Sequence, residues 1–131
     1  MPLLTLETTC RLGPADKRAV TDRLTELYAD HMETGTGHVA VVIHTHPNGG
    51  LALGRLTPDE DAVLLDADVR RGRSFDQQRA FVEAAFEAVA THWGVPTENA
   101  YAVVTAHDGE QFHEADRVLA SWDADEAGEG P

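Results

Sequence analysis

The feature that most constrains the fold of this chain is an internal repeat. The tripeptide Arg-Ala-Val at residues 18–20 recurs as Arg-Ala-Phe at 79–81, and Ala-Val-Val at 40–42 recurs at 102–104. The offsets are 61 and 62 residues, so the two matches share nearly one register. Two such matches, set in the same order of secondary structure, indicate a duplicated unit of about sixty residues.

Each unit has the hydrophobic periodicity of a strand, a helix and a second strand. The predicted elements are residues 3–9, 14–32 and 38–46 in the first unit, and residues 62–69, 74–92 and 100–106 in the second. Ser74 and Gln77 have the spacing of a capping box at a helix start. The Val- and Ile-rich run at 38–46 is expected to be a buried strand, and residues 51–53 a short hairpin arm.

Two β-α-β units with right-handed crossovers can join into one four-stranded sheet with both helices on one face. The expected fold class is therefore α/β (α+β), with one domain over residues 1–120 made of units at about 2–55 and 60–120. The other face of the sheet would stay bare and apolar, so oligomerisation is expected. Residues 121–131, which are acidic and Gly-rich, are expected to form a flexible tail.

Charge and composition exclude several classes of partner. The chain has 10 Lys and Arg against 23 Asp and Glu, and its formal net charge of -13 disfavours nucleic acid and anionic membrane surfaces. No segment approaches the roughly 18 apolar residues of a membrane span. Cys10 is the single cysteine, so no intrachain disulfide is possible and a reducing compartment is expected. These features favour a cytoplasmic protein.

Three features of the sequence now coincide. They are a strand that opens with Pro2, the duplicated unit, and the arginine-rich segment 69–74 ahead of the second helix. In this combination the chain resembles the tautomerase superfamily over about residues 2–120, in particular its fused two-repeat members such as cis-3-chloroacrylic acid dehalogenase and malonate semialdehyde decarboxylase. The resemblance implies a homotrimer that acts on a small carboxylate substrate.

The motifs do not choose between those two subgroups. Arg70 with Gly72, Arg73 and Ser74 resembles the dehalogenase pattern. The Arg-Gly-Arg of residues 71–73 resembles the decarboxylase pattern, as does the His-Thr-His-Pro that ends the preceding strand.

The resemblance also implies further site residues, together with departures from the family pattern. Tyr28 stands where dehalogenase-like members place a histidine on the first helix, and Val103 or Val104 stands where they have an active-site tyrosine. Glu114 corresponds to the acid that helps to activate water in that subgroup. His38 falls near an aspartate of the decarboxylase-like members. Tyr28 and His38 are therefore expected to bind substrate, and Glu114 to be catalytic.

The chemistry expected of Pro2 follows from its amine. Once Met1 is removed, Pro2 carries an α-amino group, whose ordinary pKa is about 7.7 to 8.0, and burial beside guanidinium groups lowers such a value. A neutral amine can abstract a proton next to a carbonyl and return it elsewhere, which is keto-enol tautomerisation. This chemistry needs no metal and no organic cofactor.

Arginine complements such a base because its planar fork binds a carboxylate and stabilises developing enolate charge. Arg73 is the strongest candidate, since both subgroup patterns include it, and Arg70 is expected to share the catalytic role. Arg71 and Arg73 are expected to hold the substrate carboxylate. Arg70 and Arg71 are adjacent, so a regular strand would direct at most one of them into the pocket, unless the strand has already ended there.

Three functions remain open at this point. The first is a tautomerase with Pro2 as general base on a small 2-oxo acid or its enol. The second is a cofactor-independent dehalogenase, hydratase or decarboxylase acting on a three-carbon acid, with Glu114 positioning water. The third is a non-catalytic protein that binds a small acid or another protein. His44 and His46 share a strand face with metal-ligand spacing, but no third ligand is evident, so no metal site is expected.

Overall fold

The structure of the protein, a computed structural model, describes residues 2–120, 122 and 123. Within them it has four strands, two α-helices and two short 3-10 helices. In chain order these are β1 (Leu3–Thr8), α1 (Pro14–His31), β2 (Ala40–Thr45), β3 (Val63–Arg70), α2 (Phe75–Trp93), η1 (Thr97–Asn99), β4 (Ala100–His107) and η2 (Gly109–Gln111). The four strands and two helices predicted for the two units are present, with ends within two residues of the prediction.

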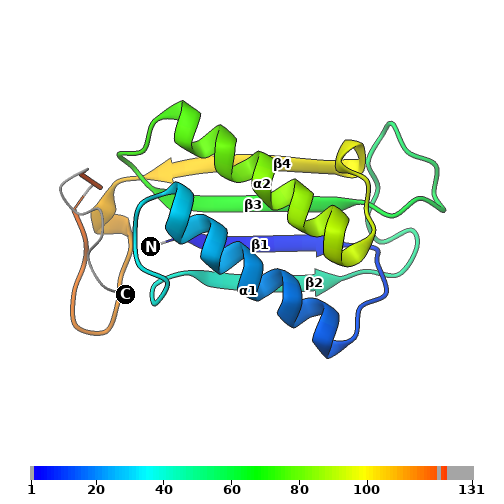
Figure 1. Cartoon of the computed structure of the whole chain (residues 1–131), viewed down its shortest axis with the longest axis horizontal. Coiled ribbons are helices and arrows are strands. Elements are labelled where there is room, and N and C mark those ends of the chain that lie inside the picture. Colours follow the sequence, from blue (N-terminus) through cyan, green and yellow to red (C-terminus); the bar gives the residue numbers. More distant parts are fainter. Residues whose placement is uncertain (1, 121, 124–131) are drawn as a thin grey trace.

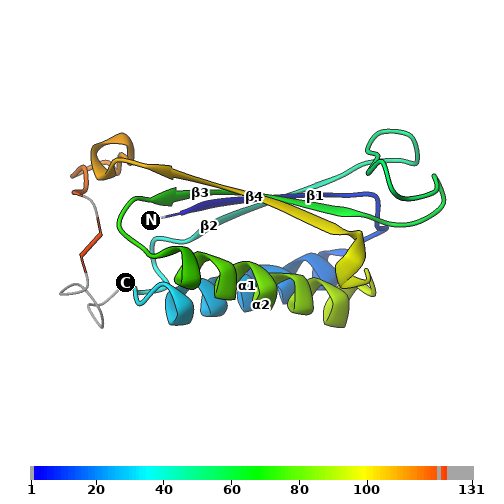
Figure 2. The same ribbon diagram turned by 90° about the horizontal axis from the view of Figure 1, so that it is seen from above.

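The four strands form one mixed sheet with the order β2-β1-β3-β4. β1 is parallel to β2 and β3 is parallel to β4, as two β-α-β units require. The units meet in the middle, where β1 and β3 are antiparallel and Leu3 is opposite Asp68. Both helices cover one face of the sheet and leave the other face bare (Figures 1 and 2). The predicted fold is therefore confirmed.

The core lies between the helices and the sheet. Alternate strand residues such as Leu4 and Leu65 point toward the helices and are at most 3% exposed. Tyr28 of α1 meets Phe81 of α2 edge to face, with ring centroids 5.2 Å apart. Burying an aliphatic or aromatic side chain of this size contributes about 1.5–3 kcal/mol, so this layer holds the two repeats together.

The sequence signals at the ends of α2 are also confirmed. The Ser74 hydroxyl accepts a hydrogen bond from the Gln77 backbone N–H at 3.1 Å, and the Gln77 side chain accepts one from the Ser74 backbone N–H at 3.1 Å. Gly94 follows the helix with φ of 72°, a left-handed conformation that glycine adopts without strain.

Two local predictions are wrong. β2 is not buried, because it is the edge strand of the sheet, and Val42 is 37% exposed. Its Val- and Ile-rich composition suggested burial, but an edge position cannot be read from composition. Residues 51–53 do not form a hairpin arm; they lie in a loop of turns and bends between β2 and β3.

The bare sheet face, which the sequence predicts to be apolar, carries apolar and charged side chains together. Exposed Tyr101 and Val103 share it with the charged side chains of Glu7 and Asp66. Trp122, assigned to the expected flexible tail, is only 8% exposed, and its backbone N–H donates to the Arg71 carbonyl at 2.7 Å. Residues 121 and 124–131 of that expected tail lie outside the described residues.

The residues predicted to form the site lie near one end of the sheet, where strands start or stop. β1 and β2 begin there, and β3 and β4 end there. The segment after β4 passes over this end, at the left of Figure 1, and forms a small bridge between His113 and Val118. Within the described residues neither helix has the length and apolar character needed to cross a membrane.

Candidate functional site

A cavity of about 570 Å³ lies at this end of the sheet, beside the start of β1 and the ends of β3 and β4. It receives residues from the start of β1, the approach to β2, the ends of β3 and β4, and the segment that begins with η2. The lining residues are Pro2, Leu3, His38, Ala40, Asp68, His107, Gln111, Phe112 and His113. The sheet register brings residues from both repeats to this one cavity, which the linear sequence does not show.

Pro2 lines the cavity and is buried. Its carbonyl accepts a hydrogen bond from the backbone N–H of Ala40 at 3.2 Å, so the start of β1 is fixed against β2. This contact holds the backbone of Pro2 on a rigid element rather than on a loose terminus.

His38, which lines the cavity with Pro2, contacts Glu114, which is not among the lining residues. His38 Nδ1 lies 2.7 Å from Glu114 Oε1, and Arg117 donates to Glu114 Oε2 at 3.0 Å. Arg117 Nη2 also lies 3.1 Å from His38 Nε2. Because arginine can only donate, the contacts fit an imidazole with its hydrogen on Nδ1. The hydrogen bond from His38, followed by that from Arg117, holds the pKa of Glu114 below its usual value.

A second histidine-carboxylate pair lies in the same cavity and is not evident from the sequence. His107 Nε2 is 2.9 Å from Asp68 Oδ1. The His107 ring also meets Phe112 edge to face, with centroids 5.9 Å apart. The available signal was a histidine at the end of the last strand, but its partner on β3 follows from the register of two parallel strands.

The arginines of residues 70–73 take three different environments. Arg73, 7% exposed, donates through Nε and Nη2 to the Met32 carbonyl at 3.1 and 3.0 Å. Its guanidinium also lies over the Trp122 ring, 4.4 Å from the centroid. Arg73 is therefore engaged on the helix side of the sheet and is not among the residues that line the cavity with Pro2.

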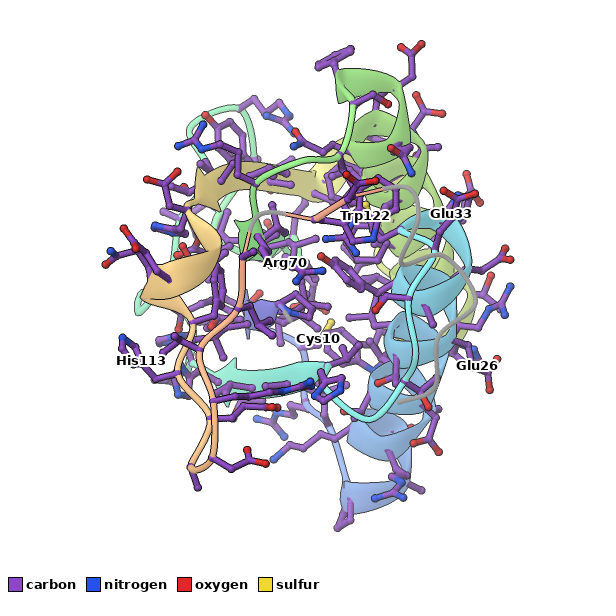
Figure 3. The ribbon with its side chains drawn as sticks, turned by 90° about the vertical axis from the view of Figure 1, so that its left-hand side faces the viewer. Cys10, Glu26, Glu33, Arg70, His113 and Trp122 are labelled. Carbon is purple, nitrogen blue, oxygen red and sulfur yellow. The ribbon has the colours of Figure 1, made fainter. Side chains whose placement is uncertain are left out.

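Arg70 and Arg71 have different environments, because β3 ends at Arg70 and Arg71 already lies in the turn that follows. Arg70 is 4% exposed and donates to the Ala120 carbonyl at 3.1 Å, whereas Arg71 is exposed and donates to Asp108 at 2.9 Å. Figure 3 looks onto this end of the molecule, with Arg70 near its middle, Trp122 on the helix side and His113 on the bare side of the sheet.

Tyr28 lies in the core and not in the cavity lining. Its side chain is fully buried, and its hydroxyl has no hydrogen-bond partner among the described residues. Burial raises the pKa of Tyr28, while the charges of Arg73 and Arg70 oppose that shift. Tyr28 thus belongs to the core between the helices and the sheet.

The other histidine pair lies at the far end of β1. Glu7 Oε1 is 2.8 Å from His46 Nε2 and 3.2 Å from His44 Nδ1. The hydrogen bond to His46 is the largest effect that lowers the pKa of Glu7. His38 is not part of this group. Among the residues that the structure describes, no three His, Cys, Asp or Glu side chains are arranged to hold a metal ion.

Comparison with known proteins adds information on the fold. No family model matches the sequence, and no curated protein matches it. A solved structure of N1, a member of the cis-3-chloroacrylic acid dehalogenase family, is 28% identical, with a TM-score of 0.77 over 89% of this chain and 84% of that one. The macrophage migration inhibitory factor of Toxoplasma gondii is 18% identical, with a TM-score of 0.76 over 89% and 99%.

A third solved structure, the FG41 malonate semialdehyde decarboxylase inhibited by 3-bromopropiolate, is 14% identical, with a TM-score of 0.73 over 85% of this chain and 87% of that one. All three belong to one superfamily and match nearly the whole described chain. The chain therefore has the fold of the tautomerase superfamily, and the resemblance first seen in Pro2, the repeat and the arginine segment is confirmed at the level of the fold.

Proposed function

We propose that this protein is a tautomerase-like isomerase in which Pro2, freed by removal of Met1, is the general base for a small 2-oxo acid or its enol. The observation that carries the proposal is the position of Pro2, buried at the start of β1 and lining a cavity of about 570 Å³. Such a cavity has room for a small organic acid. The tautomerase-superfamily fold supports the same reaction class.

The arginine segment supplies the positive charge that this reaction needs. Asp68 is opposite Leu3, so Arg70, two residues further along β3, lies next to the start of β1. A buried guanidinium in that position favours the neutral form of a nearby amine and an anionic substrate. Arg71, which is exposed just after the end of β3, would exchange its contact with Asp108 for the substrate carboxylate. Arg73 contributes its charge from the helix side, where Met32 and Trp122 hold it.

The proposal includes the setting expected from the sequence. The catalytic domain spans residues 2–120, works without a cofactor and assembles as a homotrimer through the bare sheet face, in the cytoplasm. His38, which lines the cavity with Pro2, contacts the substrate there.

A second candidate function has one specific observation in its favour. The pair His38–Glu114, 2.7 Å apart, keeps a carboxylate with a lowered pKa beside the cavity. An ionised glutamate can position and activate a water molecule. This would suit hydration, hydrolytic dehalogenation or decarboxylation of a three-carbon acid, with protonated Pro2 as the acid. These reactions release halide or carbon dioxide, or add water, and ketonisation does none of these.

The test begins with the intact mass of the native protein and the rate of phenylenolpyruvate ketonisation. The protein is then treated with 2-oxo-3-pentynoate, which inactivates another protein of the same fold. We expect a mass that lacks Met1, one adduct on Pro2 and loss of turnover in proportion to labelling. Pro2→Ala is the matched control, because it keeps the cavity but removes the ring amine.

The same samples separate the alternatives. Release of halide from 3-chloroacrylate, or of carbon dioxide from malonate semialdehyde, without ketonisation would select the second candidate. Retained Met1, or turnover that survives complete labelling of Pro2, would contradict both catalytic functions. Thermal stabilisation by a small acid without turnover of any substrate would then favour a binding protein.

A further inference from the structure

We propose that His107, held by Asp68, is a second acid–base residue of this site, which acts on the carbonyl oxygen of the substrate while Pro2 acts on the neighbouring carbon. The inference rests on the proposed tautomerase function and assigns a role to a pair of residues that the arginine-based mechanism does not use.

The sheet places the two groups on opposite sides of one cavity. Pro2 precedes β1, His107 ends β4, and β3 lies between these strands. Adjacent strands are about 4.8 Å apart, so the two backbones are separated by roughly 10 Å. The His107 side chain reaches back over β3 to Asp68, which narrows this gap. The remaining space suits a planar acid with a few carbon atoms, held between both groups.

The hydrogen bond to Asp68 fixes which nitrogen of His107 is available. An ionised carboxylate only accepts hydrogen bonds, so the 2.9 Å contact assigns the hydrogen to Nε2. Among the described residues, no hydrogen bond reaches Nδ1 of His107. Phe112, edge to face with the ring, limits its rotation. The side chains of His107 and Asp68 are 37% and 33% exposed, so a ligand in the cavity can reach them.

The other paired histidine of the cavity differs in this respect. Both ring nitrogens of His38 are occupied, Nδ1 by Glu114 and Nε2 by Arg117. His38 therefore has no nitrogen left for proton exchange with a substrate unless one of these contacts breaks. His107 has one nitrogen fixed by a carboxylate and one open toward the cavity, which is the arrangement that a histidine acid–base catalyst requires.

Enolisation in this site moves two protons and keeps the total charge unchanged. In the direction from keto to enol, the neutral nitrogen of Pro2 takes the proton from the α-carbon. The electron pair of that C–H bond forms the C=C bond, and the π electrons of the carbonyl move to its oxygen. That oxygen takes the proton from Nδ1 of the His107 imidazolium, so the products are the enol, protonated Pro2 and neutral His107. Asp68 stabilises the imidazolium before transfer, and solvent restores both groups.

The experiment compares His107→Ala with His92→Ala, a matched control on the exposed last turn of α2. For ketonisation of phenylenolpyruvate we expect kcat of the His107 variant to fall by about 100-fold with little change in KM. Added imidazole should restore part of kcat in the His107 variant and none in the control. Labelling of Pro2 by 2-oxo-3-pentynoate should proceed in both variants, because the base itself is unchanged.

Asp68 is a positioning residue and has its own test. Asp68→Asn should lower kcat in the wild-type background but should cause no further loss of kcat in a His107→Gln background. If Asp68 had only a structural role, Asp68→Asn would lower kcat by a similar factor in both backgrounds. The glutamine amide of His107→Gln can still donate a hydrogen bond to Asp68. This variant is therefore used if His107→Ala does not fold.

Two failures are distinguishable. A wild-type protein without ketonisation overturns the proposed function and this inference together. A wild-type protein that Pro2 labelling inactivates, but whose folded His107→Gln variant turns over at the wild-type rate, overturns this inference alone. A third result also overturns the inference: His107→Ala loses activity that imidazole does not restore, and Asp68→Asn lowers kcat equally in both backgrounds. The pair would then have only a structural role.

Discussion

Among single residues, Glu114 has a pKa that depends on its contacts with His38 and Arg117. His38 and Arg117 both contact it, and the His38 hydrogen bond contributes most to its lowered pKa. We expect His38→Gln to raise the pKa of Glu114 toward that of a free glutamate, because the replacement removes the imidazole contact. Carbon-13 NMR titration of the side-chain carboxyl group measures this directly.

The same shift has a consequence for stability. A folded-state pKa below the unfolded value means that the carboxylate stabilises the fold above the unfolded pKa, and this contribution is lost as the pH falls through the folded pKa. The His38→Gln variant should therefore lose less stability than the wild type on acidification. His92→Gln, on an exposed helix turn, is the control. An identical Glu114 titration in wild type and His38→Gln would contradict the contact.

The sequence predicted part of this site. Pro2, His38 and Glu114 were selected from the family resemblance, and the structure gathers them at one edge of the sheet. Asp68 and His107 were missed, because their contact depends on the register of β3 against β4. A single histidine at a strand end carries no information about which residue faces it on the neighbouring strand.

The environment of Arg73 could not be predicted for a related reason. The arginine pattern places Arg73 just before α2, but the direction of its side chain depends on which other residues pack there. The Met32 carbonyl at the end of α1 and the Trp122 ring of the last segment both take part. These three residues are far apart in the sequence, so only the folded chain brings them together.

At the element scale, the turn between β3 and α2 is locked by the segment that follows β4. Gly72 has φ of 131°, and a Cβ atom there would lie 2.2 Å from the Trp122 carbonyl oxygen. Gly72→Ala must therefore move either the turn or Trp122, and we expect it to lower the free energy of unfolding by more than about 1 kcal/mol. Urea unfolding measures this loss.

Gly54→Ala is the matched control for Gly72→Ala. Gly54 has no positive φ, and a Cβ atom added there would have nothing within 4 Å, so Gly54→Ala should leave stability nearly unchanged. Acrylamide quenching of tryptophan fluorescence should increase in the Gly72 variant, since Trp122 loses its packing. If both alanine variants unfold at the same urea concentration, Trp122 does not pack on the turn as described.

The elements themselves were largely predictable, because their signals are local. The capping box of Ser74 and Gln77, the Gly94 helix end and the strand periodicities each depend on a few neighbouring residues. The exposure of β2 was not predictable, because an apolar run has the same composition in a central strand and in an edge strand. The packed position of Trp122 was hidden by the acidic composition around it.

At the scale of the whole molecule, the bare sheet face is the surface proposed for assembly. Large apolar side chains on it are 37–52% exposed; they are Leu3, Val42, Tyr101 and Val103. We expect the protein to have about three times the 14.2 kDa mass of one chain in solution. Val103→Lys, in the middle of β4, should shift the protein to monomer, measured by light scattering after size-exclusion chromatography.

The control for this variant is Phe75→Lys. Phe75 is 75% exposed at the start of α2, away from the sheet face, so its replacement should leave the mass unchanged. A wild-type protein that stays monomeric at high concentration would contradict assembly through the sheet.

The net charge of the chain sets a condition on that assembly. Each chain carries a formal charge of -13, so bringing chains together raises their mutual repulsion. Salt screens this repulsion, with a Debye length of about 30 Å at 0.01 M and about 8 Å at 0.15 M ionic strength. The oligomer should therefore dissociate more readily on dilution at 0.01 M than at 0.15 M salt, and Val103→Lys should stay monomeric at both. Assembly that weakens as salt is added would instead mean that pairs of opposite charges between the chains hold them together.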